Sequence, residues 1–182
     1  MSKVLVPLAD GFEEIEAMSI IDVLNRADIE VIVAGLDAYE VEGANTKLKI
    51  VTKTLLDEVD VDSLDMVVLP GGLPGAEHLA KSKKIKDIIK FLHVKNKKVA
   101  AICAAPWALK EAGILDGKKH TNYPSFEKFT GVEGYIDNQD VVVDGNIITS
   151  RGPATAMSFA LEIVKTLKGK DVYTQVKNGL LA

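Results

Sequence analysis

Four short apolar runs constrain the fold of this 182-residue chain more than any other feature of its sequence. They are "KVLVPLA" (3–9), "EVIVAGL" (30–36), "DMVVLPGG" (65–72) and "KVAAICA" (98–104). A strand that is covered on both faces has this composition, because neither of its sides needs to be polar. The runs therefore predict the strands of a buried, mostly parallel sheet.

Helical patterns alternate with these runs, at about 13–27, 75–80, 83–96, 105–112 and 153–168. Such alternation predicts an α/β protein with helices on both faces of the sheet. Two segments predict small antiparallel hairpins: 39–54, outside the main order, and 139–150, with Asp144-Gly145 or Gly145-Asn146 at its turn. The length fits one domain over 1–182, by a prior of roughly 150 residues each.

Composition excludes several classes of function. The net charge of −4 offers no basic surface for nucleic acid. No stretch approaches the ~20 apolar residues that span a bilayer, and the start lacks a signal peptide. One cysteine cannot form an internal disulfide, which favours a reducing, cytoplasmic location. No histidine pair or thiol cluster has metal-ligand spacing, and no phosphate-binding loop is present, so we expect neither metal nor cofactor.

The single cysteine, Cys103, lies where the strand "VAAIC" ends and a helix begins near Pro106. Ligands of open α/β sheets gather at the carboxyl ends of the strands, and helix N-terminal amides stabilise a thiolate. The pattern small-x-Cys-x-small also resembles the sharp strand–helix turn that presents a nucleophile. We therefore expect a reactive Cys103 with a lowered pKa, while a buried structural cysteine is the alternative.

Gly71 and Gly72 follow the third predicted strand, and their amides could hold an oxyanion at the same sheet edge. A plain tight turn explains them equally well. Acidic residues also gather at the start of the first helix, where Asp10 could cap it and Glu13, Glu14 and Glu16 suit its dipole.

Glu16 lies on an apolar stripe of the predicted first helix. The apolar residues at helical spacing around it are Phe12, Ile20 and Val23. A carboxylate there is costly unless it is protonated or paired. Glu14 has Met18 and Ile21 on its own side, so periodicity alone leaves the choice open.

The stretches "GFEEIEA", "VVLPGG", "AAICAAPWALKEAGIL" and "TSRGPATAMSFALEIV" together resemble the ThiJ/PfpI superfamily, in the branch of the Parkinson's-disease protein deglycase and its bacterial homologues. The resemblance implies a flavodoxin-like three-layer sandwich and a homodimer. It implies that Cys103 is the oxidisable nucleophile and that Glu16 is a protonated partner of its sulfur. Gly71, Gly72 and Ala104 match the oxyanion positions, and Arg26 and Arg151 match arginines near the site or the dimer contact.

The chain departs from this pattern at a histidine. The human member of the branch has a histidine just before a proline, where this chain has Tyr123 before Pro124. His120 comes three residues earlier and either reaches the site or forms a polar strand end. The peptidase branch has a histidine directly after its cysteine, where Ala104 stands here, so peptidase activity is not expected.

Three functions fit these residues. The first is a glyoxalase or deglycase that acts on small reactive carbonyls through Cys103 and Glu16. The second is a redox sensor in which an oxidant converts Cys103 to its sulfinate. The third is a chaperone-like dimer, which would need large exposed apolar patches.

Overall fold

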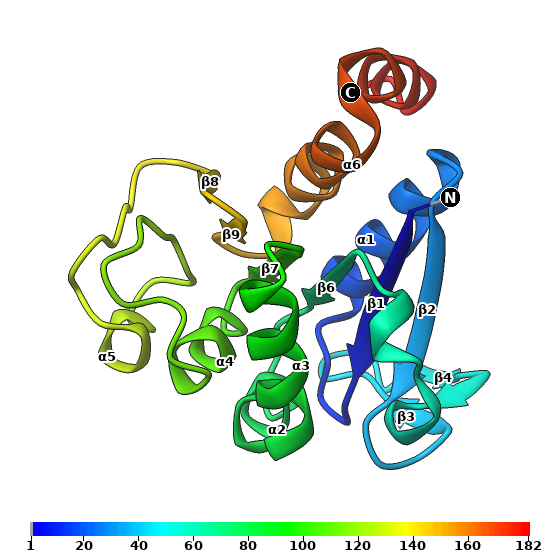
Figure 1. Cartoon of the computed structure of the whole chain (residues 1–182). Helices are drawn as coiled ribbons and strands as arrows, with labels where there is room; N and C mark the ends of the chain where they lie inside the picture. Colours follow the sequence, from blue (N-terminus) through cyan, green and yellow to red (C-terminus); the bar gives the residue numbers. More distant parts are fainter. Residues whose placement is uncertain (1) are drawn as a thin grey trace.

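The computed structural model describes residues 2–182 and contains a seven-stranded sheet in the order β5-β2-β1-β6-β7-β9-β8 (Figure 1). Its pairs are parallel except that of β8 with β9. The strands of this sheet are β1 (Lys3–Leu8), β2 (Glu30–Gly35), β5 (Thr54–Leu55), β6 (Met66–Leu69), β7 (Lys98–Ile102), β8 (Val141–Asp144) and β9 (Ile147–Ser150). The four runs predicted as strands form its centre, and the mostly parallel sheet is confirmed.

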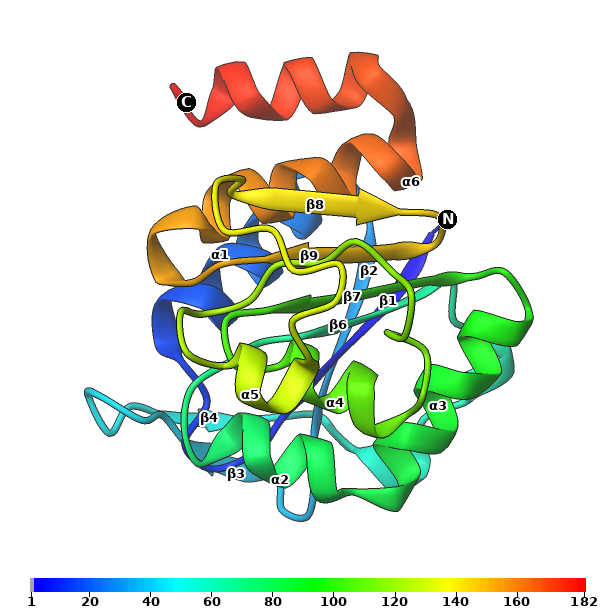
Figure 2. The same ribbon diagram turned by 90° about the vertical axis from the view of Figure 1, so that its left-hand side faces the viewer.

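Helices cover both faces of the sheet, which gives three layers (Figure 2). On one face α1 packs against α6, and on the other α2, α3 and α4 lie together. The helices are α1 (Glu14–Arg26), α2 (Gly75–Lys81), α3 (Lys83–Val94), α4 (Pro106–Glu111), α5 (Glu127–Thr130) and α6 (Ala156–Gly179), with short 3₁₀ turns at Leu56–Glu58, Val61–Ser63 and Pro153–Thr155. The core is built where these layers meet, with Phe12 and Phe159 among its largest fully buried side chains.

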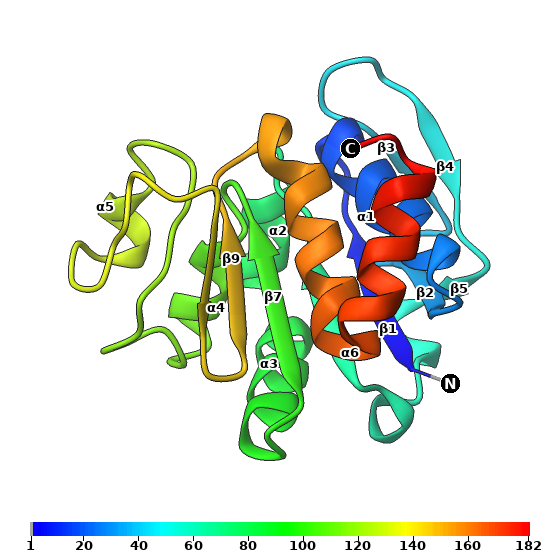
Figure 3. The same cartoon turned by 90° about the horizontal axis from the view of Figure 1, so that it is seen from above.

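The last helix extends beyond the predicted end at 168. Gly169 has φ 84° and ψ 177°, values outside the helical region, so α6 consists of two helical segments joined by a kink. Glycine tolerates this backbone conformation because it has no Cβ. The second segment turns back and runs alongside the first (Figures 2 and 3). The sequence pattern ended at the kink and missed this segment.

The hairpin regions partly differ from expectation. The segment 39–54 contains the antiparallel pair β3 (Glu40–Glu42) and β4 (Lys49–Val51), but its end enters the main sheet as β5, parallel to β2. The turn between β8 and β9 consists of Gly145 and Asn146, and Gly145 has φ 63°. Glycine first in a two-residue turn with positive φ suits the twist of a hairpin.

The order of the strands identifies one place where a ligand is expected to bind, between β1 and β6. From β1 the chain runs to β2 and β5 on one side, and from β6 it runs to β7 and β9 on the other. Ligands of open α/β sheets bind beyond the carboxyl ends of strands at such a switch point. The loops there lead from β1 into α1 and from β6 into α2, and the next strand, β7, ends just before Cys103.

No helix within residues 2–182 combines the length and apolar character that crossing a bilayer requires.

Candidate active site

Cys103 lies at a strained elbow between β7 and α4. Its φ is 63°, which a residue with a side chain rarely adopts. Backbone hydrogen bonds hold the turn: the Cys103 N–H donates to the Ser150 carbonyl at 2.9 Å, and the Cys103 carbonyl accepts from the Tyr123 N–H at 2.9 Å. The residue is 8% exposed. The elbow predicted from the sequence is therefore present, and its cysteine is buried at the edge of the sheet.

Backbone amides surround the sulfur on two sides. The N–H groups of Gly72 and Ala104 bond to it, one from the β6–α2 loop and one from the elbow itself. Gly71 is packed so closely that an added Cβ would lie 2.6 Å from the Cβ of Cys103 and 2.8 Å from Oε2 of Glu16. Only glycine permits this approach. The two glycines therefore do more than form a tight turn.

Glu16 is fully buried, and its carboxyl group lies next to the Cys103 thiol. Its Oε2 accepts the Gly71 N–H at 2.7 Å, while its Oε1 is buried without a partner of ordinary hydrogen-bond geometry. A buried carboxylate with an unpaired oxygen is costly to ionise. Burial accordingly raises the pKa of Glu16 to about 7, against the lowering effects of the Gly71 N–H and the thiol.

The thiol differs from the sequence expectation. Burial and the neighbouring Glu16 raise the pKa of Cys103, and the amides of Gly72 and Ala104 offset only part of this increase. The lowered pKa predicted from the helix amides alone is therefore wrong. Burial and the neighbouring Glu16 thus favour the thiol over the thiolate, and burial favours the protonated form of Glu16.

Two further acidic residues have roles that the sequence did not assign. Glu13, not Asp10, caps α1: its Oε2 accepts the Glu16 N–H at 2.8 Å. Asp10 instead accepts the N–H of Glu42 at 2.8 Å through Oδ1. Glu14 points to the opposite side and binds the hairpin loop at Asn45 and Thr46. The sequence does not readily predict Glu13 as the N-cap, because Asp is more common than Glu at that position.

His120 is not brought to the sulfur. It is buried, forms a β-bridge with Tyr135, and its Nδ1 lies 3.0 Å from the Lys118 carbonyl oxygen. Its Nε2 has no hydrogen-bond partner. None of these contacts involves Glu16 or Cys103.

Tyr123 and Arg151 line the same surface cavity near the elbow. Tyr123 is bonded through its N–H to the Cys103 carbonyl, and both side chains line a surface cavity of about 260 Å³. The remaining residues around this cavity are Pro124, Asp140, Gly152, Pro153, Ala154 and Thr155. Arg26 lies elsewhere: it is exposed near the far end of α1 and pairs with Asp22 at 2.7 Å. The structure therefore does not support a place for Arg26 in the site of its own chain.

No three His, Cys, Asp or Glu side chains converge in a metal-binding arrangement within residues 2–182. The chemistry that the site can perform is that of a thiol, a carboxyl group with a raised pKa, and two amides directed at the sulfur. This set can transfer a proton within a dry pocket and hold a negative oxygen next to the sulfur.

The fold and the site together define an α/β protein with one thiol at a strand–helix elbow, paired with a buried carboxyl group. Residues 2–166 match the DJ-1/PfpI family, and the chain belongs to that family. This confirms the resemblance seen in the sequence.

Individual relatives agree with this assignment. Protein dj-1beta of Drosophila melanogaster is 44% identical over 183 residues, which cover 100% of this chain and 98% of that protein. The crystal structure of Drosophila DJ-1beta has a TM-score of 0.95, at 43% identity over 100% of this chain and 99% of that one, and it confirms the flavodoxin-like fold. The glutathione-independent glyoxalase DJR-1.2 of Caenorhabditis elegans is 36% identical over 169 residues, covering 92% of this chain and 89% of that protein. The chain spans 41% of the length of Protein DJ-1 homolog B of Arabidopsis thaliana, to which it is 44% identical over 180 residues, or 98% of this chain.

Proposed function

We propose that this chain acts on reactive carbonyls, converting 2-oxo aldehydes such as methylglyoxal to 2-hydroxy acids in the manner of a glyoxalase or deglycase. The observation that carries the proposal is the buried carboxyl group of Glu16 beside the Cys103 thiol, both packed against Gly71, with the amides of Gly72 and Ala104 next to the sulfur. The glyoxalase name of the nematode relative supports the substrate class.

The first step is addition of the sulfur to the aldehyde carbon. A sulfur–carbon bond forms, the carbonyl π electrons move to oxygen, and Glu16 accepts the thiol proton. The N–H groups of Gly72 and Ala104, which bond to the sulfur in the free site, lie close enough to stabilise the new oxyanion. Proton return to that oxygen gives a hemithioacetal. Glu16 suits this role because a pKa of about 7 lets it accept and release protons at neutral pH.

The second step moves a proton between the two carbons of the adduct. The Glu16 carboxylate removes the proton from the former aldehyde carbon and returns it to the neighbouring carbon, while the hydroxyl proton of the adduct passes to the ketone oxygen, which leaves a thioester of the 2-hydroxy acid. Water then cleaves the sulfur–carbon bond and releases the acid and the thiol. The sum is aldehyde plus water to hydroxy acid, so no oxidant or cofactor is needed. Tyr123 replaces the histidine of the human member and serves as a hydrogen-bond donor to the substrate rather than as a base.

The test is conversion of methylglyoxal to lactate by the purified chain. We expect slow turnover by the wild type and none by Cys103→Ser, which keeps a hydroxyl group of similar size but lacks the sulfur nucleophile. Equal lactate formation by the two proteins would overturn the proposal.

The redox sensor is a second candidate, and the free Oε1 of Glu16 favours it. Peroxide converts the thiol first to a sulfenate and then, with a second peroxide, to a sulfinate, releasing one water each time. A sulfinate oxygen could accept a hydrogen bond from protonated Glu16. If peroxide-treated chain stops at two added oxygens by intact mass while lactate formation is absent, the sensor replaces the enzyme.

We also propose that the chain forms a homodimer through the apolar face that α1 shares with β2 and β4. A hollow of about 540 Å³ lies there. The residues that line it are Met18, Ile21, Val31, Ile32, Val33, Ile50, Val51, Thr52, Lys53 and Thr54. The side chain of Val51 in β4 is 72% exposed, and that of Ile15 in α1 is 59% exposed. A self-complementary patch of this kind fits a second copy of the chain.

Light scattering at micromolar concentration tests this. We expect twice the chain mass of 19.6 kDa, and Val51→Glu should shift the equilibrium toward monomer. A wild-type mass near that of one chain would contradict the dimer.

A further inference from the structure

Glu13 and Glu14 are adjacent carboxylates that differ in how well they are bonded. Both are 7% exposed at the start of α1. Oε1 of Glu14 accepts the N–H of Asn45 at 3.0 Å, the N–H of Thr46 at 2.7 Å and the Thr46 hydroxyl at 3.0 Å. Burial alone would raise the pKa of Glu14, but these donors outweigh burial and lower it. Glu14 is therefore a satisfied anchor for the hairpin loop.

Glu13 is bonded more sparsely and faces the site. Its Oε2 accepts only the Glu16 N–H, and its Oε1 accepts only the Asn45 side-chain N–H, at a long 3.3 Å. The Glu13 backbone N–H donates to the Gly71 carbonyl at 2.9 Å, and Gly71 in turn donates to Glu16. Glu13 thus touches the site through its side chain and through its backbone.

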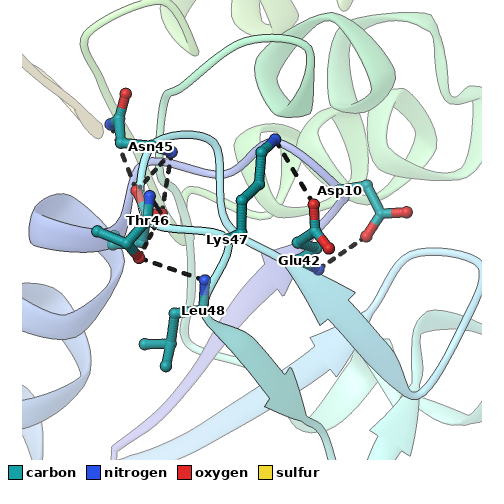
Figure 4. A network of polar contacts seen from close by, with 7 residues as sticks. Asp10, Glu42, Asn45, Thr46, Lys47 and Leu48 are labelled. Carbon is teal, nitrogen blue, oxygen red and sulfur yellow. Dashed lines mark hydrogen bonds and ion pairs between the residues drawn. The ribbon is translucent and has the colours of Figure 1, made fainter.

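The hairpin loop holds Glu13 in this place. Figure 4 shows Asn45 and Thr46 on one side of the loop, and Lys47 with Glu42 and Asp10 on the other. Lys47 is 3.5 Å from Glu42 and so is engaged away from the two carboxylates of α1. Among residues 2–182, no lysine, arginine or histidine forms an ion pair or hydrogen bond with Glu13 or Glu16.

We propose that Glu13 is a positioning residue whose buried negative charge, held by Asn45, keeps a proton on the Glu16–Cys103 pair at neutral pH. Two carboxyl groups on one helical turn, without a nearby cation, cannot both ionise freely. The titratable groups that face Glu16 are Glu13 on its own helix and Cys103 on the β7–α4 elbow, while the β6–α2 loop contributes backbone N–H groups. The charge of Glu13 adds to burial in raising the pKa of Glu16.

This inference rests on the proposed function, in which Glu16 exchanges protons with the thiol. It makes Glu13 a residue that never touches substrate yet sets the pH range in which the pair works. Glu13→Gln removes the charge while its amide oxygen can still cap α1, so the helix should remain intact.

The test is the pH profile of Cys103 alkylation by iodoacetamide, read by intact mass; because the chain has one cysteine, the signal has one source. We expect Glu13→Gln to move the midpoint to lower pH, because removing a like charge makes ionisation of the pair easier. Glu13→Asp, which keeps the charge, should restore the wild-type profile. Asp22→Asn is the control on the same helix: it removes an exposed carboxylate that pairs with Arg26 at 2.7 Å, and it should leave the midpoint in place.

An unchanged midpoint in Glu13→Gln, or the same shift in Asp22→Asn, would overturn the inference. Thermal unfolding of each variant identifies any loss that comes from a weakened helix. The alkylation profile needs no carbonyl turnover, so a shifted midpoint in a chain that forms no lactate would reject the proposed function and keep this inference.

Discussion

The first turn of α1 has two sides, and a buried glutamate sits on each. On the inner side Glu16 receives one strong backbone hydrogen bond, from Gly71, and has an oxygen without a partner. On the outer side Glu14 receives hydrogen bonds from backbone and hydroxyl groups of the hairpin loop. The pKa of Glu16 is raised and that of Glu14 is lowered. Glu14 and Glu16 carry the same side chain two positions apart, but they differ in the number of hydrogen-bond donors around the carboxyl group. Glu14 therefore anchors the hairpin loop, whereas Glu16 is suited to exchange protons.

The largest effect is expected from removing the Cys103 sulfur, which is the nucleophile next to Glu16. Cys103→Ala should abolish methylglyoxal turnover, because no other sulfur exists in the chain except in methionine. Lactate formation against a blank without protein measures this, and circular dichroism verifies the fold. Residual turnover well above the blank would show that the reaction does not take place at Cys103 and Glu16.

Neutralising each glutamate in turn sharpens the contrast. Glu16→Gln should lower turnover by about 10²–10⁴-fold, the usual contribution of a general acid–base group. Glu14→Gln should change it by only a few-fold. The comparison breaks if the two variants lose similar activity, since both sides of the turn would then serve the reaction.

The pH dependence of stability tests the raised pKa of Glu16 directly. A carboxyl group with a pKa of about 7 when folded and 4.5 when unfolded stabilises the fold fully below pH 4.5, and this contribution is lost as the pH rises through 7. The wild-type free energy of unfolding should therefore fall by about 3 kcal/mol more than that of Glu16→Gln between pH 4.5 and 8. Urea unfolding of both proteins at the two pH values measures it, and parallel behaviour would mean an ordinary Glu16.

The anchor on the outer side should matter for stability. Glu14→Gln weakens the charged hydrogen bonds to the loop and should cost about 1–3 kcal/mol. Limited proteolysis should then cut first within residues 43–48. A variant with wild-type stability and an uncut loop would show that Glu14 does not hold the hairpin.

The smallest effect is expected at His120, which is buried but lies away from the first turn of α1. His120→Ala should alter turnover by a few-fold at most, because its ring contacts Lys118 and Tyr135 rather than the pair. Steady-state kinetics with methylglyoxal decides this. A loss as large as that of Cys103→Ala would make His120 the base and would end the account given for Glu16.

Local pattern predicted a good part of this arrangement. Valine-rich runs identified the central strands. The apolar stripe of the first helix predicted a buried acid but left Glu14 and Glu16 open, and only the family resemblance selected Glu16, which is 0% exposed. The small residues around Cys103 indicated the elbow. These features depend on neighbours a few residues away, which a sequence displays directly.

Features that depend on distant neighbours were missed. The pKa of Cys103 follows from burial and from Glu16, 87 positions earlier in the chain, so helix amides alone predicted the wrong direction. The roles of Glu13 and Glu14 depend on Asn45 and Thr46, which the hairpin brings to α1. The short elements β5 and α5 were also missed, because two to four residues carry too little periodicity to be recognised.

The space at Gly71 has a consequence for mutational tolerance. A single methyl group there would meet both Cys103 and Glu16, although Gly71 contributes only backbone atoms. At Gly179, by contrast, an added methyl would meet no atom within 4 Å. In a saturation library screened for carbonyl turnover, Gly71→Ala should thus be depleted almost as strongly as substitutions of the cysteine, while Gly179→Ala should survive. Selection at position 71 would therefore favour glycine because it has no side chain.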